Sequence, residues 1–351
     1  MTLTESVLWP LTLPYGAIVR LKALTYRKHV LRQRHLDGIV ISVGNLTVGG
    51  TGKTPMVLWI AQRLLLEAKR AGILSRGYRG QPRRGQRANL SSAAADSASD
   101  EVQLLRSRLG DRVAFGIGAD RFARGRELAR QGINWFILDD GFQHQRLARD
   151  VDIVLIDATN PFGGGHLLPA GRLREPKFTL ARADIIVITR SSHAPAVEAA
   201  IRHESKAPIF YARPQLDSVQ NISDGQSANA VAPEQLTKLF AFCGIGNPSA
   251  FLANLRDWNI PIAGHRFFPD HHRYTEKDAE EIARLAREAG ATGVICTEKD
   301  VYNLQSAHFQ TNIFYCSISM RIDRDEEFWQ AVIQTAKSRA QSAQIKLPVA
   351  G

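Results

Sequence analysis

The chain has 351 residues, of which 44% are hydrophobic and 23% charged, a composition that excludes a disordered or collagen-like protein and allows one large domain or two ordinary ones. Its three cysteines form no CxxC pair, which argues against a disulfide scaffold or cysteine-based zinc site and indicates a reducing compartment. A net charge of +11 favours an anionic partner, whether nucleic acid, anionic lipid or a phosphorylated substrate.

The first predicted element is an N-terminal amphipathic helix within residues 1–36. Residues 6–19 carry no charge, but they are too short to span a bilayer, which takes about 20 apolar residues, and their flanks do not suit a secretory signal. Basic side chains interleaved with apolar ones follow: Arg20, Lys22, Arg27, Lys28, Arg32 and Arg34. The pattern is typical of a helix lying in a membrane interface, and equally of a helix packed on its own domain with a solvated basic face.

Residues 37–216 are predicted to form the core domain, in which short apolar strands alternate with helical segments. Strands are expected near 38–45, 72–75, 113–117, 135–138, 153–156 and 185–188, and helices near 55–69 and 100–109. Fully apolar strands alternating with helices predict an α/β fold with a parallel sheet and helices on both faces. Residues 81–99 are polar and aperiodic, which indicates a loop.

A smaller α/β domain is expected in the C-terminal part of the chain. Its predicted strands lie at 239–246 and 293–297, and its helices near 249–258 and 276–289. The predicted organisation is therefore an N-terminal helix (1–36), a nucleotide-binding core (37–216), a linker (217–236), a smaller α/β domain (237–336) and a polar, disordered tail (337–351).

A glycine-rich loop between the first predicted strand and the following helix is the strongest functional signal. It consists of Thr47, Val48, Gly49, Gly50, Thr51, Gly52, Lys53 and Thr54. Glycines let backbone N–H groups turn toward phosphates, and the helix N-terminus adds positive potential. In such a P-loop Lys53 reaches the β- and γ-phosphates and the Thr54 hydroxyl ligates Mg²⁺, although Thr47 stands where the first glycine is usual.

A carboxylate that holds the magnesium ion is expected at the end of another apolar strand. Asp139 and Asp140 follow such a run, and we expect them to divide the work, one on the metal and one on a second partner. We assign the metal to Thr54 and Asp139, with Asp140 open as the alternative and Asp157 as a competitor. Residues 297–300 (TEKD) resemble a guanine-reading motif but have Glu where Lys is needed, which favours ATP over GTP.

Six motifs occur in a specific order: VGNLTVGGTGKTP (43–55), LSRGYRG (74–80), LDDGFQH (138–144), GRLREP (171–176), FPDHHRY (268–274) and TEKD (297–300). Together they closely resemble the tetraacyldisaccharide 4'-kinase family, over nearly the whole chain to about residue 330. The resemblance implies transfer of the γ-phosphate of ATP to the 4'-hydroxyl of tetraacyldisaccharide 1-phosphate, giving lipid IVA in lipid A biosynthesis. It also implies docking, through the N-terminal helix, at the cytoplasmic face of the inner membrane of a Gram-negative bacterium.

The resemblance assigns roles to individual residues as well. Asp100 matches the base that accepts the hydroxyl proton and His271 its orienting partner, while Lys53, Asp139 and Asp140 complete the catalytic set. Ser99 stands where the family usually has Gly, and an alternative role for Asp100 is to cap the following helix. Substrate contacts are expected at matching motif positions: Arg76, Tyr78, Arg121, Gln143, His144, Arg172, Arg174 and Glu175.

Other functional classes fit the sequence less well. A GTPase switch or metallochaperone would need a guanine motif or Cys/His clusters, and His271–His272 has no second cluster to complete a zinc site. A nucleic-acid-binding module would interleave basic and aromatic residues, whereas the basic residues here concentrate behind the apolar N-terminal segment. Gly163–Gly165 is interpreted as a flexible loop, and no feature indicates an obligate protein partner.

Overall fold

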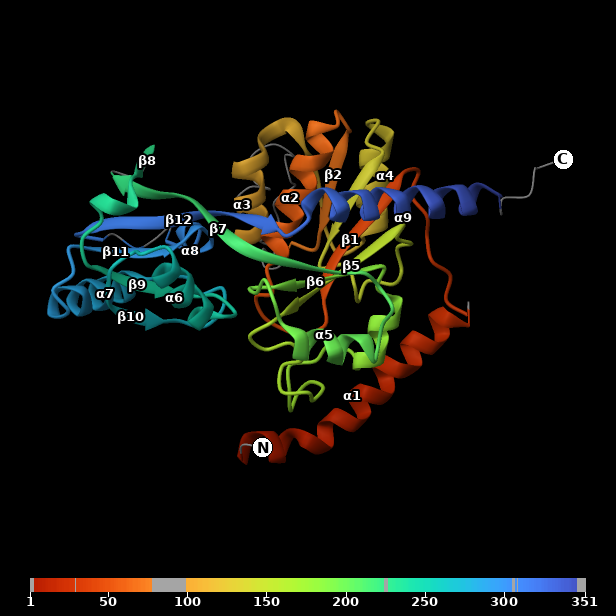
Figure 1. Ribbon diagram of the computed structural model, residues 1–351, viewed down its shortest axis with the longest axis horizontal. Coiled ribbons are helices and arrows are strands. Elements are labelled where there is room, and N and C mark those ends of the chain that lie inside the picture. The colour runs from red at the N-terminus through yellow and green to blue at the C-terminus, as the bar shows by residue number, and fades with distance from the viewer. Residues whose placement is uncertain are drawn as a thin grey trace, which may run out of the picture. The chain divides into compact units, whose positions relative to one another are not determined.

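The computed structural model describes residues 3–28, 30–77, 99–223, 227–304, 307 and 309–345 (Figure 1). The chain divides into two compact units, each assembled from separate stretches of sequence. Unit 1 comprises residues 1–77, 109–213 and 321–351, and unit 2 comprises residues 78–108 and 214–320. Strands β7 (Ile209–Ser223) and β12 (Asn312–Ile322) contribute residues to both units.

Unit 1 is built on a parallel sheet in the order β7-β6-β5-β1-β4-β2-β3. Its strands include β1 (Ile39–Asn45), β2 (Ala71–Ser75), β3 (Ala114–Ile117), β4 (Trp135–Asp139), β5 (Val151–Asp157) and β6 (Ile185–Thr189). Its helices are α1 (Leu3–Arg27), α2 (Lys53–Leu66), α4 (Arg121–Arg130), α5 (Pro195–Arg202) and α9 (Asp325–Ile345). The predicted mostly parallel α/β architecture is confirmed.

The core of unit 1 explains why its strands are apolar throughout. Every residue of β4 and β5 is buried, so side chains that alternate between the two faces of the sheet are all covered. On one face Phe136 packs with Leu128 of α4, and farther along Ile188 packs with Ile201 of α5. Helices α2 and α9 both contact β1, and an edge-on contact between Trp59 and Phe328 joins them.

Unit 2 combines parallel strands with a hairpin. Its strand order is β10-β9-β11-β12-β7, and β8 pairs antiparallel with β7. The further strands are β8 (Ser227–Val231), β9 (Leu239–Cys243), β10 (Ile262–Phe267) and β11 (Gly293–Thr297). The helices are α3 (Asp100–Leu109), whose last residue belongs to unit 1, α6 (Pro248–Asp257), α7 (Glu276–Glu288) and α8 (Glu298–Val301).

Several parts of the predicted organisation differ from the structure. Residues 99–108, expected in the core domain, fall in unit 2, and residues 321–336, expected in the smaller domain, fall in unit 1. The expected linker at 217–236 consists largely of strands β7 and β8, in which Val219 pairs with Val231 and is fully buried in the core of unit 2. Its polar residues indicated a linker, but alternation along a strand lets polar and buried residues follow one another. The expected disordered tail from residue 337 begins inside α9, which continues to Ile345, while 346–351 lie outside the described residues. Residues 81–98 of the loop predicted at 81–99 also lie outside them.

Helix α1 ends at Arg27, nine residues before the predicted boundary at 36, and presents two different faces. Thr12 and Gly16 are buried, and the Tyr15 hydroxyl donates a hydrogen bond of 2.9 Å to the carbonyl oxygen of Arg174, so one face packs on unit 1. The other face exposes large apolar side chains: Trp9, Leu11, Leu13, Ile18, Leu21 and Leu24. In the part of the chain that is described, no helix has both the length and the apolarity needed to cross a membrane.

Candidate active site

The glycine-rich loop follows β1, at the centre of the parallel sheet between β4 and β5. Gly49 and Gly52 have φ angles of 114° and 89°, in the region that glycine adopts without strain, and Gly52 caps the N-terminus of α2. The Val48 N–H donates to the carbonyl oxygen of Arg172 at 2.8 Å, and Thr189 Oγ1 donates to the carbonyl oxygen of Thr51 at 3.0 Å. The predicted strand–loop–helix arrangement is therefore present, and hydrogen bonds to Arg172 and from Thr189 fix the loop.

Lys53, the first residue of α2, faces the second of the two adjacent carboxylates. Its Nζ lies 3.5 Å from Asp140 Oδ1, and Arg174 Nη1 lies 2.8 Å from both oxygens of the same carboxylate. Burial raises the pKa of Asp140, but the attraction of Lys53 and Arg174 outweighs it, and the net pKa is below the usual range. Asp140 has a left-handed φ of 50°, which turns the chain sharply at the end of β4.

Asp139 and Asp140 have different surroundings. Asp139 is buried at the end of β4 and accepts a hydrogen bond of 3.0 Å from Ser75 Oγ on the neighbouring strand β2. The competitor Asp157 lies at the end of β5, where it pairs with Arg190 and accepts hydrogen bonds from the backbone and hydroxyl of Thr159. The Asp157 carboxylate is thus engaged by Arg190 and Thr159 at the turn that follows β5.

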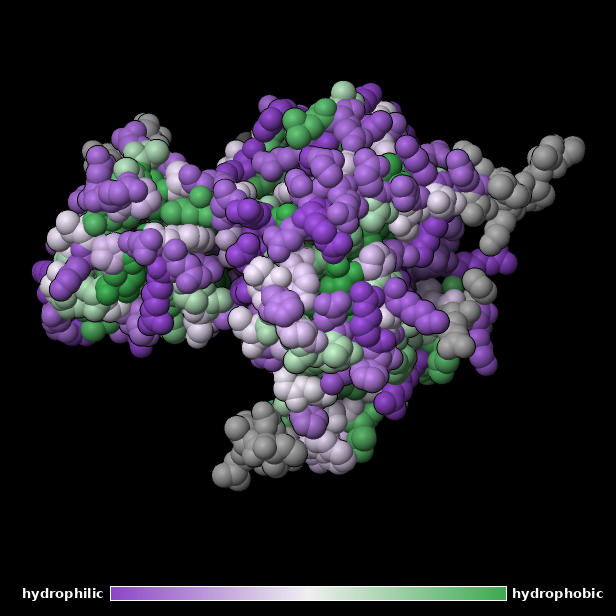
Figure 2. Space-filling model, in the orientation of Figure 1, coloured by the Kyte–Doolittle hydropathy of each residue, from purple (hydrophilic) through white to green (hydrophobic). Residues whose placement is uncertain are grey.

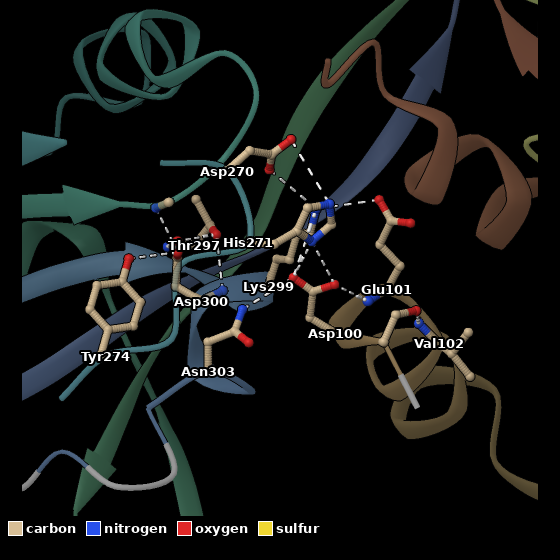
Figure 3. A network of polar contacts seen from close by, with 12 residues as sticks. Asp100, Glu101, Val102, Asp270, His271, Tyr274, Thr297, Lys299, Asp300 and Asn303 are labelled. Atoms are coloured by element: carbon tan, nitrogen blue, oxygen red, sulfur yellow. Dashed lines mark hydrogen bonds and ion pairs between the residues drawn. The ribbon is translucent and has the colours of Figure 1, made fainter. Parts of the chain in front are cut away.

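In unit 2, a buried carboxylate meets a histidine that is 171 positions later in the sequence (Figure 3). Asp100 is 5% exposed, and its oxygens lie 2.9 and 3.1 Å from His271 Nδ1. Asn303 Nδ2 donates to Asp100 Oδ2 at 3.1 Å. Ser99 Oγ accepts the Val102 N–H at 3.4 Å, so Ser99 serves as the cap of α3, the role considered as the alternative for Asp100. The structure therefore brings together the two residues that the family resemblance had paired.

The loop that carries His271 is held by residues of the TEKD motif. His271 has a left-handed φ of 60°, and its N–H donates to the carbonyl oxygen of Gly244 at 2.9 Å. Asp300 accepts hydrogen bonds of 2.8 Å from the Gly244 N–H and from the Tyr274 hydroxyl, and Thr297 and Asp300 form a capping box at the start of α8. In this chain the TEKD motif (297–300) therefore stabilises the loop that carries His271.

The Asp100–His271 pair predicts a pH-dependent stability difference. Burial raises the pKa of Asp100, but the hydrogen bond from His271 and the charge of Lys299 lower it to below its usual range; the hydrogen bond to Asp100 raises the pKa of His271. A lowered acid pKa stabilises the fold above about pH 4, and a raised histidine pKa stabilises it below about pH 6.5 and loses the effect as the pH rises through the folded value. His271→Asn, which tolerates the left-handed backbone, should therefore destabilise the protein most between these limits.

Urea unfolding of the full chain at about pH 5.5 and pH 9 would measure this difference. The free energy lost by His271→Asn should be larger at the lower pH, and His265→Asn, at an exposed histidine of the same unit, is the control. If His271→Asn lowers the free energy of unfolding equally at both pH values, or more at pH 9, the result would contradict an ion pair between Asp100 and His271.

The residues expected to contact the substrate have varied surroundings. Gln143 donates to the carbonyl oxygen of Asn45 at 2.9 Å, and Arg174 lies on Asp140, so both adjoin the glycine-rich loop. Burial and the surrounding cations, first Arg121, lower the pKa of His144 to about 4, so its imidazole is neutral at physiological pH. The remaining positions are an exposed Arg76 and Arg172, a buried Arg121, and a buried Glu175 that pairs with Arg182 at 2.7 Å. Tyr78 lies outside the described residues.

Sequence reasoning missed two residues that touch Asp100. Lys299 belongs to the quoted TEKD motif but was given no role of its own, and Asn303 belongs to none of the quoted motifs. In the sequence, Lys299 could be recognised only as part of the TEKD motif, which does not match a guanine-binding motif. Ser75, which holds Asp139, belongs to the quoted motif LSRGYRG but was not singled out.

A glycine-rich loop between a central strand and a helix, with a lysine directed at a carboxylate, defines the class of P-loop nucleotide-binding proteins. The family model of tetraacyldisaccharide-1-P 4'-kinase (LpxK) matches residues 4–337, and the chain belongs to this family.

Relatives and a solved structure agree with the family model. The chain is 40% identical over 332 residues to a tetraacyldisaccharide 4'-kinase of Geobacter metallireducens, covering 90% of this chain and 93% of that protein. It is 35% identical over 346 residues to the protein of the same name from Desulfotalea psychrophila, covering 95% and 97%. The crystal structure of LpxK from Aquifex aeolicus in complex with ATP matches with a TM-score of 0.70 at 30% identity, over 95% of this chain and 99% of that one.

Proposed function

We propose that this protein transfers the γ-phosphate of ATP to the 4'-hydroxyl of tetraacyldisaccharide 1-phosphate, giving lipid IVA in lipid A biosynthesis. The observation that carries the proposal is the glycine-rich loop with Lys53 directed at Asp140, in a chain that matches the kinase family over residues 4–337. The ATP in the related Aquifex aeolicus structure supports ATP as the phosphate donor.

The loop of unit 1 suits the phosphates of ATP. Its positive-φ glycines and the N-terminus of α2 favour negative charge, and the Lys53 ammonium can exchange Asp140 for the β- and γ-phosphate oxygens. Arg174, already 2.8 Å from Asp140, keeps that carboxylate paired when Lys53 moves to the nucleotide. Asp140 thus acts as the resting partner of the lysine, which leaves Asp139 for the metal.

Residues at the end of β4, in the glycine-rich loop and at the start of α2 fit a magnesium ion. Asp139 and Thr54 supply oxygen atoms, which Mg²⁺ prefers, and nearby in the loop the Thr51 hydroxyl oxygen is buried with no hydrogen-bond partner among the described residues. When bound, Mg²⁺ neutralises charge that develops on the β- and γ-phosphates. Asp139, held by Ser75, and Thr54 would hold the ion.

Asp100 acts as the general base in this proposal. The 4'-hydroxyl oxygen attacks the γ-phosphorus, its proton passes to the Asp100 carboxylate, and ADP leaves with the electron pair of the broken P–O bond. His271 Nδ1, 2.9 Å from Asp100 Oδ2, orients the carboxylate, and the lowered pKa of Asp100 keeps it ionised and able to accept a proton at neutral pH.

Cationic and polar side chains near the loop and in the neighbouring motifs are proposed to bind the anionic acceptor. Arginine donates two parallel hydrogen bonds to a phosphate, which suits the 1-phosphate of the disaccharide. The proposed contacts are Arg76, Tyr78, Arg121, Gln143, His144, Arg172, Arg174 and Glu175.

The exposed face of α1 is proposed to dock on the cytoplasmic face of the inner membrane, where an acylated acceptor resides. Ile18 and Leu21 are 67% and 63% exposed, and hydrophobic green patches lie where Figure 1 places α1 (Figure 2). Exposed Arg20 lies between these apolar residues, so apolar burial and attraction to anionic headgroups act together. The buried Thr12 and Gly16 keep the helix on unit 1.

Charges placed on this face should release the protein from membranes. We expect the triple variant Leu13→Glu, Ile18→Glu and Leu21→Glu to bind vesicles containing anionic lipid at least about tenfold more weakly in co-sedimentation, because three apolar contacts are lost and negative charge is added. The matched control is Leu66→Glu at the exposed end of α2, which should bind as wild type does. Equal binding of all three proteins would contradict docking through α1.

The activity itself is tested with a defined acceptor. Wild-type protein, ATP, Mg²⁺ and tetraacyldisaccharide 1-phosphate in detergent should give a product carrying one added phosphate by mass spectrometry. An acceptor that lacks the 4'-hydroxyl should stay unchanged. ATP consumption without phosphorylated lipid would contradict the proposal and favour a nucleotide-dependent switch.

A further inference from the structure

Lys299 lies among three carboxylates of unit 2, and no step described above requires it (Figure 3). Its Nζ is 3.3 Å from Glu101 Oε1, 3.7 Å from Asp270 Oδ1 and 3.8 Å from Asp100 Oδ2. Its side chain is 19% exposed, so water screens these attractions less than on an open surface. A lysine in this position costs desolvation, which its three acidic neighbours offset.

Several side chains surround Asp100, and Lys299 supplies a positive charge to this group. His271 and Asp270 come from the loop before Tyr274, Lys299 and Asn303 come from α8 and the residues after it, and Glu101 follows Asp100 on α3. Without the ammonium group, Asp100 would lie near two further carboxylates, and of the groups named here His271 would be the remaining cation beside the neutral Asn303 amide. Mutual repulsion would then favour protonation of Asp100.

Helix α8 holds Lys299 in place through its neighbours. Asp300 is buried and accepts hydrogen bonds from the Gly244 N–H and the Tyr274 hydroxyl. These bonds fix the loop that carries His271. Glu298 receives two hydrogen bonds of 2.8 Å from Arg108, near the C-terminal end of α3. The three consecutive residues 298–300 therefore fasten both the helix that begins with Asp100 and the loop that carries His271.

We infer that Lys299 is a positioning residue for phosphoryl transfer, which keeps the Asp100 carboxylate ionised and directed at His271 by balancing Glu101 and Asp270. This inference rests on the proposed kinase function and adds a residue to it. Burial tends to lower the pKa of Lys299, but Glu101, Asp100 and Asp270 raise it overall, so the ammonium stays charged throughout the working pH range.

The test compares Lys299→Met, Lys299→Arg and the matched control Lys277→Met, which removes an exposed lysine of α7 in the same unit. Initial rates of lipid phosphorylation are measured between about pH 5 and pH 9 with full-length protein. Lys299→Met should lower kcat roughly 10- to 100-fold at neutral pH, leave KM for ATP within about twofold, and move the acid limb of the kcat profile to higher pH. The limb moves up because loss of the cation raises the pKa of Asp100.

Lys299→Arg should recover most of kcat and the wild-type acid limb, because the charge is kept, and Lys277→Met should match wild type. An unchanged acid limb in Lys299→Met, or equal losses in the Met and Arg variants, would overturn the inference. If Lys299→Met lowers Tm by more than about 5 °C, the double variant with Glu101→Gln, which removes one unbalanced carboxylate, replaces it in the assay. Absence of activity in the wild type would instead overturn the proposed function itself.

Discussion

Lys53→Ala is expected to lower kcat for lipid phosphorylation by about 10³-fold, because in the proposed mechanism the ammonium group contacts the β- and γ-phosphates and offsets the charge that develops there. Lys53 is the first residue of α2 and is held toward Asp140 at 3.5 Å, so its side chain already points to the loop before ATP binds. Steady-state rates with saturating ATP and acceptor measure the change.

The fold should survive this substitution. Asp140 keeps Arg174 as its partner at 2.8 Å, so no buried charge is left alone. Lys206→Ala, which removes an exposed lysine of the same unit, should leave kcat unchanged. A Lys53→Ala enzyme that is folded and retains more than about a tenth of wild-type kcat would show that the loop does not act on the transferred phosphate.

Asp100→Asn is expected to lower kcat by about 10²- to 10⁴-fold, the usual contribution of a general base. Asparagine keeps the size of the side chain and an oxygen that can accept from Asn303, but it does not take up a proton at neutral pH. KM for ATP should change little, because the substitution removes an interaction with the acceptor hydroxyl and leaves the phosphate loop intact.

This substitution separates the base from a structural role. Ser99 Oγ accepts the Val102 N–H and is unchanged in this variant, so α3 keeps this cap when Asp100 is replaced. Ser99→Ala is the matched control: it should cost about 1 kcal/mol of stability without a comparable loss of kcat. Near-wild-type turnover by Asp100→Asn would exclude Asp100 as the base.

The local parts of the fold were predictable because local patterns determine them. The run that became β1 is apolar and β-branched, the glycines that follow permit left-handed backbone, and the helix begins at Lys53, two residues before the expected position. The capping box at Thr275 and the periodic apolar residues of α7 likewise mark that helix within one residue of its predicted bounds.

Long-range features were less accessible. Val219 packs in the core of unit 2 within a polar stretch, so composition indicated a linker where a strand forms. Helix α9 returns the chain to unit 1, and its contact between Phe328 and Trp59 depends on residues far apart in sequence. No period or spacing signals such contacts.

The candidate site shows the same division. Lys53 and Asp139 were found from a loop and a strand end, whereas Asp100 and His271 were paired only through resemblance to a family, and the structure places them 2.9 Å apart. Lys299 was read as part of a nucleotide motif, but its neighbours Glu101 and Asp270 become visible only in three dimensions. Motifs identify reacting groups more readily than the charges that adjust them.

The most direct test of the kinase assignment follows a phosphate from ATP to lipid. Wild type and Lys53→Ala are incubated side by side with ATP radiolabelled at the γ-phosphate, Mg²⁺ and tetraacyldisaccharide 1-phosphate, and the lipids are separated by thin-layer chromatography. Label should enter the lipid with wild type, and its rate of entry should fall by about 10³-fold with Lys53→Ala. Well-folded wild-type protein that leaves the lipid unlabelled, whether or not it consumes ATP, would contradict the assignment.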